Sequence, residues 1–363
     1  MDFAFIIHPM NVNDIVTRFK GTKRLPREFV EKWFSRLPAF KYSKIEGIKS
    51  QSTGRTISGI FIGCPLTTEQ MLSFPEHYVV QKIIKAGRVA EKAGAGIVGL
   101  GAMTSVVADA GITIAQQLKI PVTTGNSYTV AMAMEGTKEA AAKMGIDIAE
   151  AHVVVIGATG AIGAVCSHLV SRECKYLTLI ARDRTKLDNL ARSIMHQTGQ
   201  AVKITNNLKK ALKSAQIVIT VTSSGGDIIQ PEDLPPGCVV CDVARPRDVS
   251  LRVAGARKDV LVIEGGLVQV PGKVTTNLNL GYPPDVTLAC IAETMILAME
   301  NRFESYTLGR SLTFEQVDEI YKLGEKHGFK LAGLRSFEKP VTAEEIRSIR
   351  DNAGHGASTA GIG

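Results

Sequence analysis

The sequence predicts an α/β protein built around a doubly wound parallel sheet, and three observations support this prediction. The apolar, mostly β-branched run 153–156 is typical of a strand buried on both faces. A glycine-rich turn, 157–163, follows at once and leads into a helical pattern over 164–170. Strand-like and helix-like segments then alternate as far as residue 263, which indicates right-handed βαβ crossovers. The expected fold is therefore a doubly wound parallel Rossmann sheet.

The remaining elements follow from periodicity and from turn residues. In the first third of the chain we expect strands at 3–7, 56–63, 96–100 and 120–123, with helices at 27–35, 78–93, 110–118 and 129–144. The central third is expected to hold strands at 152–156, 177–180, 201–205, 217–222, 238–243 and 260–263, with helices at 161–172, 185–196 and 207–214. An irregular stretch then reaches Gly281, and two helices follow, 286–303 capped by Asp285 and 313–327.

The composition restricts the class of protein. The chain has 363 residues, is 45% hydrophobic and carries a net charge of +8. No apolar run reaches the roughly 20 residues that a membrane span needs, so we expect no integral membrane segment. The first residues do not have a basic start, so we expect no signal peptide and a cytoplasmic location. Lysine and arginine are dispersed without interleaved aromatic residues, so an acidic carrier protein or a phosphorylated cofactor is a better partner than nucleic acid.

Cysteine and histidine give no sign of a metal site. The chain has six cysteines and seven histidines. Cys238 and Cys241 form a C-x-x-C spacing, but they lie in a strand-like run without a second pair. No histidines are spaced four apart, so we expect no bound metal and reduced cysteines.

The glycine turn has the features of a phosphate-binding site. Gly157 permits a tight turn, Gly160 lets a diphosphate approach the backbone, and Gly163 allows close packing of helix and strand. The alternative is an ordinary strand-to-helix turn. The expected phosphate-binding residues are Gly157, Thr159, Gly160, Ala161, Ile162 and Gly163.

The end of the next strand favours NADPH over NADH. Ala181 stands where an NAD site usually has an acidic residue, and Arg182 and Arg184 flank Asp183. An arginine can donate paired hydrogen bonds to a 2′-phosphate, although two solvated arginines on a loop are the alternative. Further strand ends are expected to line the nicotinamide side of the cofactor site, at Thr222, Ser223, Val243 and Gly265.

Two strands of the first region also end in small, hydroxyl-bearing loops. Substrate contacts are expected there because ligands of open α/β sheets gather at the carboxyl ends of strands. The candidates are Thr104, Ser105, Thr124 and Asn126. Helix capping or turn formation is the alternative role for each of them.

Cys290 is the candidate nucleophile. It is expected in the second turn of the helix 286–303, and its helix face includes Glu293, which a purely apolar core face would not carry. A cysteine near a helix N-terminus can have a lowered pKa, and its thiolate can take an acyl group from a thioester. The alternative is a small buried hydrophobic residue.

Taken together, these elements predict four parts. Residues 1–128 form an N-terminal α/β substrate domain, and 129–281 form the Rossmann NADP-binding domain, in which 129–150 is a linking helix. Residues 282–335 provide C-terminal helices that carry the cysteine, and 336–363 form a flexible tail.

The chain resembles the long-chain acyl-[acyl-carrier-protein] reductases known from cyanobacteria. The matching stretches follow the same order in both and are 52–59, 123–129, 157–163, 179–182, 264–266, 288–295 and 326–330. The resemblance implies an NADPH-dependent reductase that forms a fatty aldehyde from a fatty acyl thioester, with Cys290 as the acyl acceptor. The acyl donor is then an acidic acyl carrier protein or coenzyme A.

Two other functions stay open at this stage. One is a shikimate-dehydrogenase-like or glutamyl-tRNA-reductase-like NADP oxidoreductase, of which the shikimate type needs no cysteine. The other is an NADPH-sensing binding protein without turnover. The sequence does not identify the acyl chain length, the general acid, the oligomeric state or the role of the C-terminal tail.

Overall fold

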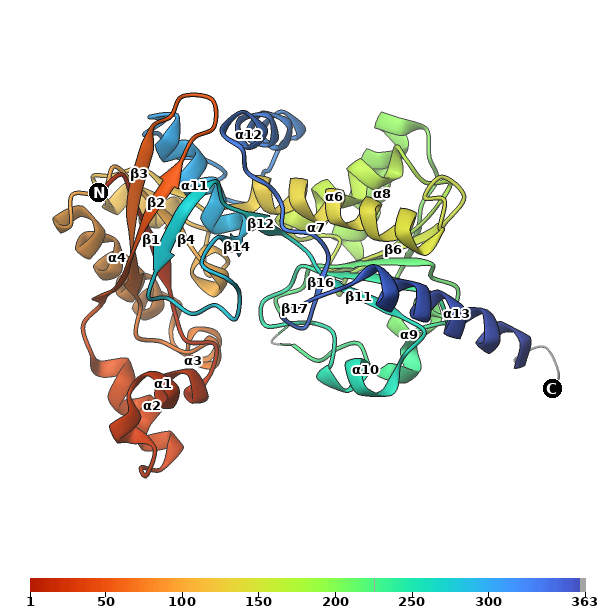
Figure 1. Cartoon of the computed structure of the whole chain (residues 1–363), viewed down its shortest axis with the longest axis horizontal. Coiled ribbons are helices and arrows are strands. Elements are labelled where there is room, and N and C mark those ends of the chain that lie inside the picture. Colours follow the sequence, from red (N-terminus) through yellow and green to blue (C-terminus); the bar gives the residue numbers. More distant parts are fainter. Residues whose placement is uncertain (225, 360–363) are drawn as a thin grey trace. The chain divides into compact units, whose positions relative to one another are not determined.

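The computed structural model describes residues 1–224 and 226–359, and its contacts divide the chain into two units (Figure 1). Unit 1 comprises Met1–Tyr128 and Val268–Lys330, and unit 2 comprises Thr129–Leu267 and the chain from Leu331 onward. Both units are α/β structures, and unit 2 has the Rossmann architecture, so the predicted fold class is confirmed. None of the described helices is long and apolar enough to cross a membrane.

Unit 1 is built on a mixed six-stranded sheet of order β13-β2-β3-β1-β4-β5. Its strands are β1 (Phe3–Ile7), β2 (Phe40–Lys49), β3 (Thr56–Gly63), β4 (Ile97–Leu100), β5 (Val122–Thr123) and β13 (Gly272–Thr276). β1 pairs in parallel with β3 and β4, and β4 pairs in parallel with β5. β2 runs antiparallel between β3 and β13.

Helices cover both faces of this sheet. They are α4 (Glu76–Lys92) on one face and α11 (Ala289–Met299) on the other. Unit 1 also contains α1 (Val12–Arg18), α2 (Arg27–Arg36), α3 (Thr68–Ser73), α5 (Ile112–Gln117) and α12 (Phe314–His327), with 3₁₀ turns η1 (Lys20–Thr22) and η2 (Ala102–Ser105). Alternate residues of β1 point to opposite faces. Ala4 and Ile6 lie in the core cluster that contains the apolar side of α4, whereas the Phe5 ring lies beside Gly99 and Thr294 of α11.

Unit 2 has a parallel six-stranded sheet of order β11-β10-β9-β6-β7-β8. The strands are β6 (His152–Ile156), β7 (Tyr176–Ile180), β8 (Lys203–Thr205), β9 (Ile217–Thr220), β10 (Val239–Asp242) and β11 (Leu261–Glu264). The helices are α6 (Asn126–Met144), which begins in unit 1, α7 (Ala161–Ser171), α8 (Arg184–Thr198), α9 (Leu208–Leu212), α10 (Leu251–Ala256) and α13 (Ala343–Thr359), with the 3₁₀ turn η3 (Pro231–Asp233). This order is that of dinucleotide-binding folds, and the order reverses between β6 and β9.

Short strands complete the structure. β14 (Val286–Leu288), β12 (Leu267–Gln269) and β15 (Lys330–Leu331) form a three-stranded sheet, and β16 (Arg335–Ser336) pairs with β17 (Lys339–Pro340).

Two strands of the six-stranded sheet of unit 1, β2 and β13, were not expected from the sequence. The pairing of β2 with β3 is interrupted by two irregularities, between Lys41 and Ser43 and between Ile45 and Ile48. Each interruption breaks the two-residue alternation by which a strand is recognised. β13 is an edge strand with one buried residue in five, so it has little hydrophobic pattern to detect.

The segment expected as a flexible tail contains regular structure. β16, β17 and α13 occupy much of 336–359, and residues 360–363 lie outside the described part of the chain. Ile346 of α13 is buried in a cluster with Met144 and Ile263. The apolar contacts near the start of α13 supply stability that the glycine-rich composition of its end does not indicate.

His8 connects the end of β1 with the turn that follows β4. Its Nε2 accepts a hydrogen bond from the Met103 backbone N–H at 3.1 Å, and its Nδ1 donates to the Pro9 carbonyl at 3.0 Å. These two contacts require the neutral ring. Burial lowers the pKa of His8 from 6.5 to about 4, against smaller opposing effects of the Pro9 carbonyl and Asp14.

We therefore expect His8 to make folding stability dependent on pH. The unfolded chain takes up a proton on this side chain below pH 6.5, whereas the folded chain does so only near pH 4. The neutral His8 ring therefore contributes its full stabilisation above pH 6.5, and this stabilisation is lost as the pH falls to about 4. A shift of this size corresponds to at most about 3 kcal/mol. Urea unfolding measures the free energy of unfolding over this pH range. Its decrease from pH 6.5 to 4 should be smaller in His8→Gln than in the wild type by that amount. An unchanged decline in the variant would contradict this role.

Candidate functional site

The glycine turn of unit 2 is shaped by close backbone contacts. Gly157 has a φ of +79°, and a Cβ at this position would lie 2.8 Å from the Val221 carbonyl oxygen. A Cβ on Gly163 would lie 2.2 Å from the Gly157 carbonyl oxygen, so only glycine lets α7 begin this close to the turn. At Gly160 a Cβ would meet only the Gly157 carbonyl oxygen, at 3.3 Å. The outer side of the turn at Gly160 is therefore open to a ligand.

The N-terminus of α7 can accept a phosphate. Gly160 is the N-cap residue, and no side chain caps the helix. Thr159, Ala161 and Ile162 are half-buried residues of the turn and of the first helical turn. Backbone N–H groups at such a terminus, together with the helix dipole, bind anions. The residues present fit a dinucleotide diphosphate.

The loop after β7 contains one arginine that is not held in an ion pair with a described residue. The Asp183 side chain caps α8 by accepting from the Lys186 N–H at 3.1 Å, and Arg184 forms an ion pair with Asp188 at 3.4 Å. Arg182 is exposed and forms no ion pair with any described residue. Of the two predicted arginines, Arg182 is thus the better placed to bind a 2′-phosphate.

A buried aspartate, which the sequence analysis did not single out, holds the loop after β9. Asp248 accepts hydrogen bonds from Thr220 Oγ1 at 2.5 Å, Thr222 N at 3.0 Å and Thr222 Oγ1 at 2.5 Å. These bonds place the Thr222 methyl group beside Gly157 and leave Ser223 exposed. Gly225, two residues beyond Ser223, lies outside the described residues.

Val243 and Gly265 lie together at the ends of β10 and β11. A Cβ on Gly265 would meet Val243 Cγ2 at 2.6 Å, so the Val243 side chain occupies the space beside Gly265. Asp242 fixes the turn after β10 by accepting from Ala244 N at 3.1 Å and Val249 N at 2.9 Å. Burial raises the pKa of Asp242 to about 6. The predicted cofactor residues thus share the carboxyl edge of one parallel sheet.

Cys290 lies closer to a helix N-terminus than the sequence suggested. The expected helix 286–303 is wrong at its start, because 286–288 form β14 and α11 begins at Ala289 after the N-cap residue Leu288. Asp285 is therefore not the cap, and Cys290 is the second residue of the helix instead of lying in its second turn. The cause is the pairing of this apolar segment with β12, which periodicity cannot reveal.

The other cysteines differ from Cys290 in burial. Of the six cysteines, all within the described residues, Cys290 alone is not buried. Burial raises the pKa of Cys64 and Cys238 to about 12 and that of Cys174 to about 11, which keeps these thiols protonated. Burial also raises the pKa of Cys166 and Cys241. Cys290 is thus the only one of the six thiols that is partly exposed, and its role as nucleophile stays a prediction.

A buried carboxylate organises the surroundings of Cys290. Glu293 is 0% exposed. Its Oε1 accepts from Thr123 Oγ1 at 2.5 Å, Thr307 Oγ1 at 3.0 Å and Gly125 N at 3.2 Å. Its Oε2 accepts from Ser127 Oγ at 2.6 Å and from Tyr128 N, in the first turn of α6, at 2.9 Å. Five donors thus compensate for the burial of this charge.

The same network brings the Gly125 loop onto Cys290. Gly125 has a φ of +75°, and a Cβ there would lie 2.3 Å from both Cα and Cβ of Cys290. Only glycine can occupy this contact. Thr124, a predicted substrate residue, is buried and donates to the Thr307 carbonyl at 2.6 Å. The structure therefore joins the 123–128 segment to the start of α11.

The remaining predicted substrate residues differ in their surroundings. Thr104 Oγ1 donates to the Gly101 carbonyl at 2.8 Å, and Ser105 Oγ donates to the Ala102 carbonyl at 2.7 Å. Both residues are buried, and these bonds are typical of turn formation. Asn126 is half-buried at the start of α6. Contact of these residues with substrate stays a prediction.

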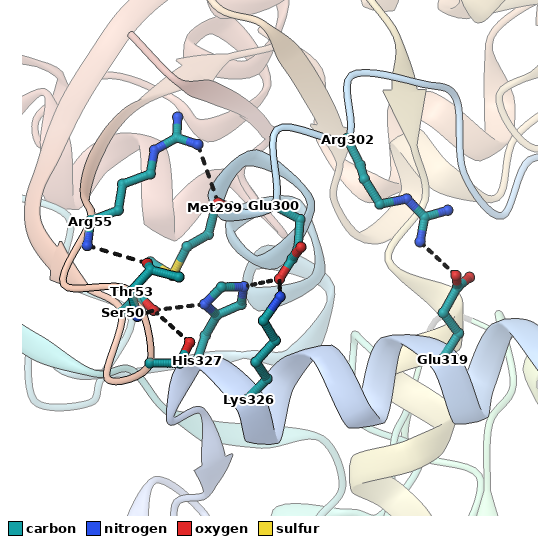
Figure 2. Close-up of polar contacts among 10 residues, drawn as sticks. Ser50, Thr53, Arg55, Met299, Glu300, Arg302, Glu319, Lys326 and His327 are labelled. Atoms are coloured by element: carbon teal, nitrogen blue, oxygen red, sulfur yellow. Dashed lines mark hydrogen bonds and ion pairs between the residues drawn. The ribbon is translucent and has the colours of Figure 1, made fainter.

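A second polar cluster holds the other end of α11 (Figure 2). His327 Nε2 bonds to Glu300 Oε1 at 2.5 Å, and His327 Nδ1 bonds to Ser50 Oγ at 2.8 Å. Arg55 donates to the carbonyl of Met299, the last residue of α11, at 3.2 Å. Burial lowers the pKa of His327, although Glu300 acts in the opposite direction. The cluster joins the 50–55 and 326–330 stretches to the helix that carries Cys290.

One protein-family model matches the nucleotide-binding unit. The family model for shikimate / quinate 5-dehydrogenase matches residues 138–264, which lie within unit 2. The match ends before Cys290. The described unit is thus that of an NADP-type oxidoreductase, and NADP(H) is the cofactor that its turn and its arginine fit.

Two curated proteins are similar over more of the chain. Aminotransferase PigE of a Serratia species is 29% identical over 365 residues, which are 96% of this chain but 42% of that protein. This chain therefore spans about two fifths of that relative's length. The long-chain acyl-[acyl-carrier-protein] reductase of Synechococcus elongatus is 29% identical over 300 residues, which are 78% of this chain and 86% of that protein.

Solved structures are less similar. L-tryptophan dehydrogenase from Nostoc punctiforme matches 97% of this chain and 87% of its own at 13% identity, with a TM-score of 0.41. A score this low supports no argument about function.

Replacing Glu293 should destabilise unit 1. Glu293→Ala leaves five donors without their acceptor, so we expect a loss of at least about 3 kcal/mol in the free energy of unfolding. Glu293→Gln keeps one carbonyl acceptor and should lose less. Urea unfolding measures both, with Glu344→Ala as a control because that side chain is 79% exposed. Equal stability of Glu293→Ala and the control would contradict the network.

Replacing Arg182 should lower the affinity for NADPH but not that for NADH. Loss of a charge-assisted bond to the 2′-phosphate costs about 1.5–3 kcal/mol, so Arg182→Ala should weaken NADPH binding roughly 10- to 150-fold. NADH binding should be nearly unchanged. Calorimetric titration of both cofactors tests this, with Arg192→Ala on the exposed side of α8 as the matched control. A similar loss for NADH would show that Arg182 does not read the 2′-phosphate.

Proposed function

We propose that this protein reduces a fatty acyl thioester to the aldehyde with NADPH and that Cys290 holds the acyl group between the two half-reactions. The observation that supports this most directly is the placement of Cys290 at the second residue of α11, less buried than any other cysteine of the chain. The 29% identity with a long-chain acyl-[acyl-carrier-protein] reductase supports the choice of substrate.

The position of Cys290 favours the thiolate form. The first turn of α11 carries the positive end of the helix dipole, and no side chain caps this terminus. A thiolate there attacks the carbonyl carbon of the acyl thioester. The bond from that carbon to the donor sulfur then breaks, and the donor leaves as a thiol after taking up a proton. The acyl group is now a thioester of Cys290.

The second half-reaction releases the product. NADPH, when bound, would supply the hydride that converts this thioester to an aldehyde and returns the Cys290 thiolate. In both steps, other residues of the chain position Cys290. Glu293 and the Gly125 loop fix the backbone of Cys290, and the cluster around His327 fixes the far end of the same helix.

The identity of the acyl donor is part of this proposal. Carrier proteins are acidic, and the net charge of +8 supports an acidic donor. Coenzyme A is the alternative, since its phosphates are also anionic. The name of the Synechococcus elongatus relative refers to a carrier protein, which favours the first donor.

A second candidate is an NADP oxidoreductase that interconverts an alcohol and a ketone, as in the shikimate / quinate 5-dehydrogenase family. The observation that favours it is the match of that family's model to residues 138–264. Such a reaction needs no cysteine. An NADPH-sensing protein without turnover is a third possibility, which binds the cofactor but oxidises it with no thioester.

Acyl transfer to Cys290 can be measured without the cofactor. We expect the protein, incubated with a long-chain acyl-carrier protein or acyl-CoA and no NADPH, to gain the mass of one acyl group. Cys290→Ser should lose both this adduct at neutral pH and the thioester-dependent oxidation of NADPH, by at least about 100-fold.

Cys174→Ser serves as the matched control, because this thiol is buried and its pKa is raised to about 11. It should keep the acyl adduct. Absence of any adduct on the wild-type protein with a range of thioesters would exclude the proposed reaction. Retained reduction of a ketone substrate by Cys290→Ser would instead support the alcohol–ketone reaction.

A further inference from the structure

The α1–α2 hairpin of unit 1 has a well-anchored inner side. Val30 and Phe34 of α2 are buried in a small core with Ile15 of α1. The Lys82 ammonium group of α4 donates to the carbonyls of Ser35 and Leu37, at 2.5 and 3.1 Å, and so caps the C-terminal end of α2. Figure 1 shows the two helices side by side at one end of unit 1. The hairpin is thus a fixed element of that unit.

Its outer side exposes large apolar side chains. Leu25, Phe29 and Trp33 are 43%, 56% and 37% exposed. Phe29 and Trp33 are one helical turn apart and share a flank of α2 with Arg36, at spacings of four and seven residues. The Trp33 ring packs against Phe19 with a centroid separation of 5.9 Å, which holds the indole at this surface.

The same segment concentrates positive charge. Residues 18–36 contain seven lysines and arginines and two glutamates, a net charge of +5 out of +8 for the whole chain. The cations are therefore less dispersed than the sequence analysis assumed. None of the seven forms an ion pair with a described residue, although the Arg18 guanidinium lies over the Tyr42 ring.

We propose that this surface, formed by Leu25, Phe29 and Trp33 with the surrounding cations, docks the protein on an anionic lipid membrane. Aromatic and leucine side chains enter the interface between headgroups and acyl chains, while lysine and arginine attract anionic lipids. An acidic protein partner, whose interface would also use aromatic residues, is the alternative that the test below separates from a membrane. The docking does not depend on the proposed reductase reaction.

The test uses the full chain and vesicles of two compositions, phosphatidylcholine alone and phosphatidylcholine with about 30% phosphatidylglycerol. We expect co-sedimentation with the anionic vesicles only, which weakens as salt rises from about 0.05 M to about 0.5 M. Trp33 is the single tryptophan of the chain, so its emission reports on this site alone. The emission should shift to shorter wavelength on binding, because the indole moves into an apolar environment.

Two variants should lower the vesicle partition coefficient by at least about tenfold, namely Phe29→Ser and the double variant Arg24→Glu/Arg27→Glu. The double variant alters only exposed residues, so it keeps the test decisive should Phe29→Ser fold poorly. Leu251→Ser, at a side chain 65% exposed, and Lys209→Glu/Lys210→Glu on α9 are the matched controls. The controls should bind almost as the wild type does, and all variants should keep their NADPH affinity.

Three results would overturn the proposal. The first is no binding to anionic vesicles, and the second is equal loss of binding in the control variants. The third is a shift of Trp33 emission on adding an acidic acyl carrier protein but not on adding vesicles, which would assign the surface to a protein partner.

Discussion

The Glu293 carboxylate is the interaction on which the geometry of unit 1 around Cys290 depends. A buried charge is stable only when its hydrogen-bonding capacity is filled, and here five donors from the 123–128 segment and Thr307 fill it. Two of these donors are backbone N–H groups. That of Gly125 lies just before α6, and that of Tyr128 lies in the first turn of α6. The carboxylate therefore fixes the start of α6 and the loop that covers Cys290 in one arrangement.

The helix that carries Cys290 is held at both ends by polar groups from other parts of the chain. At its start these are the Gly125 loop and Glu293, and at its end they are Arg55, Ser50 and His327 (Figure 2). Between the two ends, α11 packs its apolar side chains on the sheet of unit 1. A side chain on a helix fixed in this way keeps one orientation, which the proposed role of Cys290 as nucleophile requires.

The Rossmann unit could be predicted because its signals are local, as in the buried run 153–156 and the glycine turn after it. The start of α11 could not, since β14 forms only by pairing with β12, and apolar periodicity alone does not separate a short strand from a helix. Cys290 could be proposed as the nucleophile from its residue type and from its place near an expected helix start, and that role stays a prediction. The role of Glu293 was not, because its partners lie 165–170 residues away at Thr123, Ser127 and Tyr128. The role of Asp248 could not be predicted for the same reason, because its hydrogen-bond donors Thr220 and Thr222 lie 28 and 26 residues earlier in the chain.

The alternation of the chain between the two units has a consequence for biosynthesis. Residues 1–128 of unit 1 emerge from the ribosome before β13 and α11, which complete the same unit from 268–330. At the usual elongation rate, α11 follows residue 128 by roughly ten to thirty seconds. During that interval the edge of β2 is unpaired and the Phe5 face of the sheet is uncovered. Both are features at which an incomplete chain can pair or aggregate until its own later segment arrives.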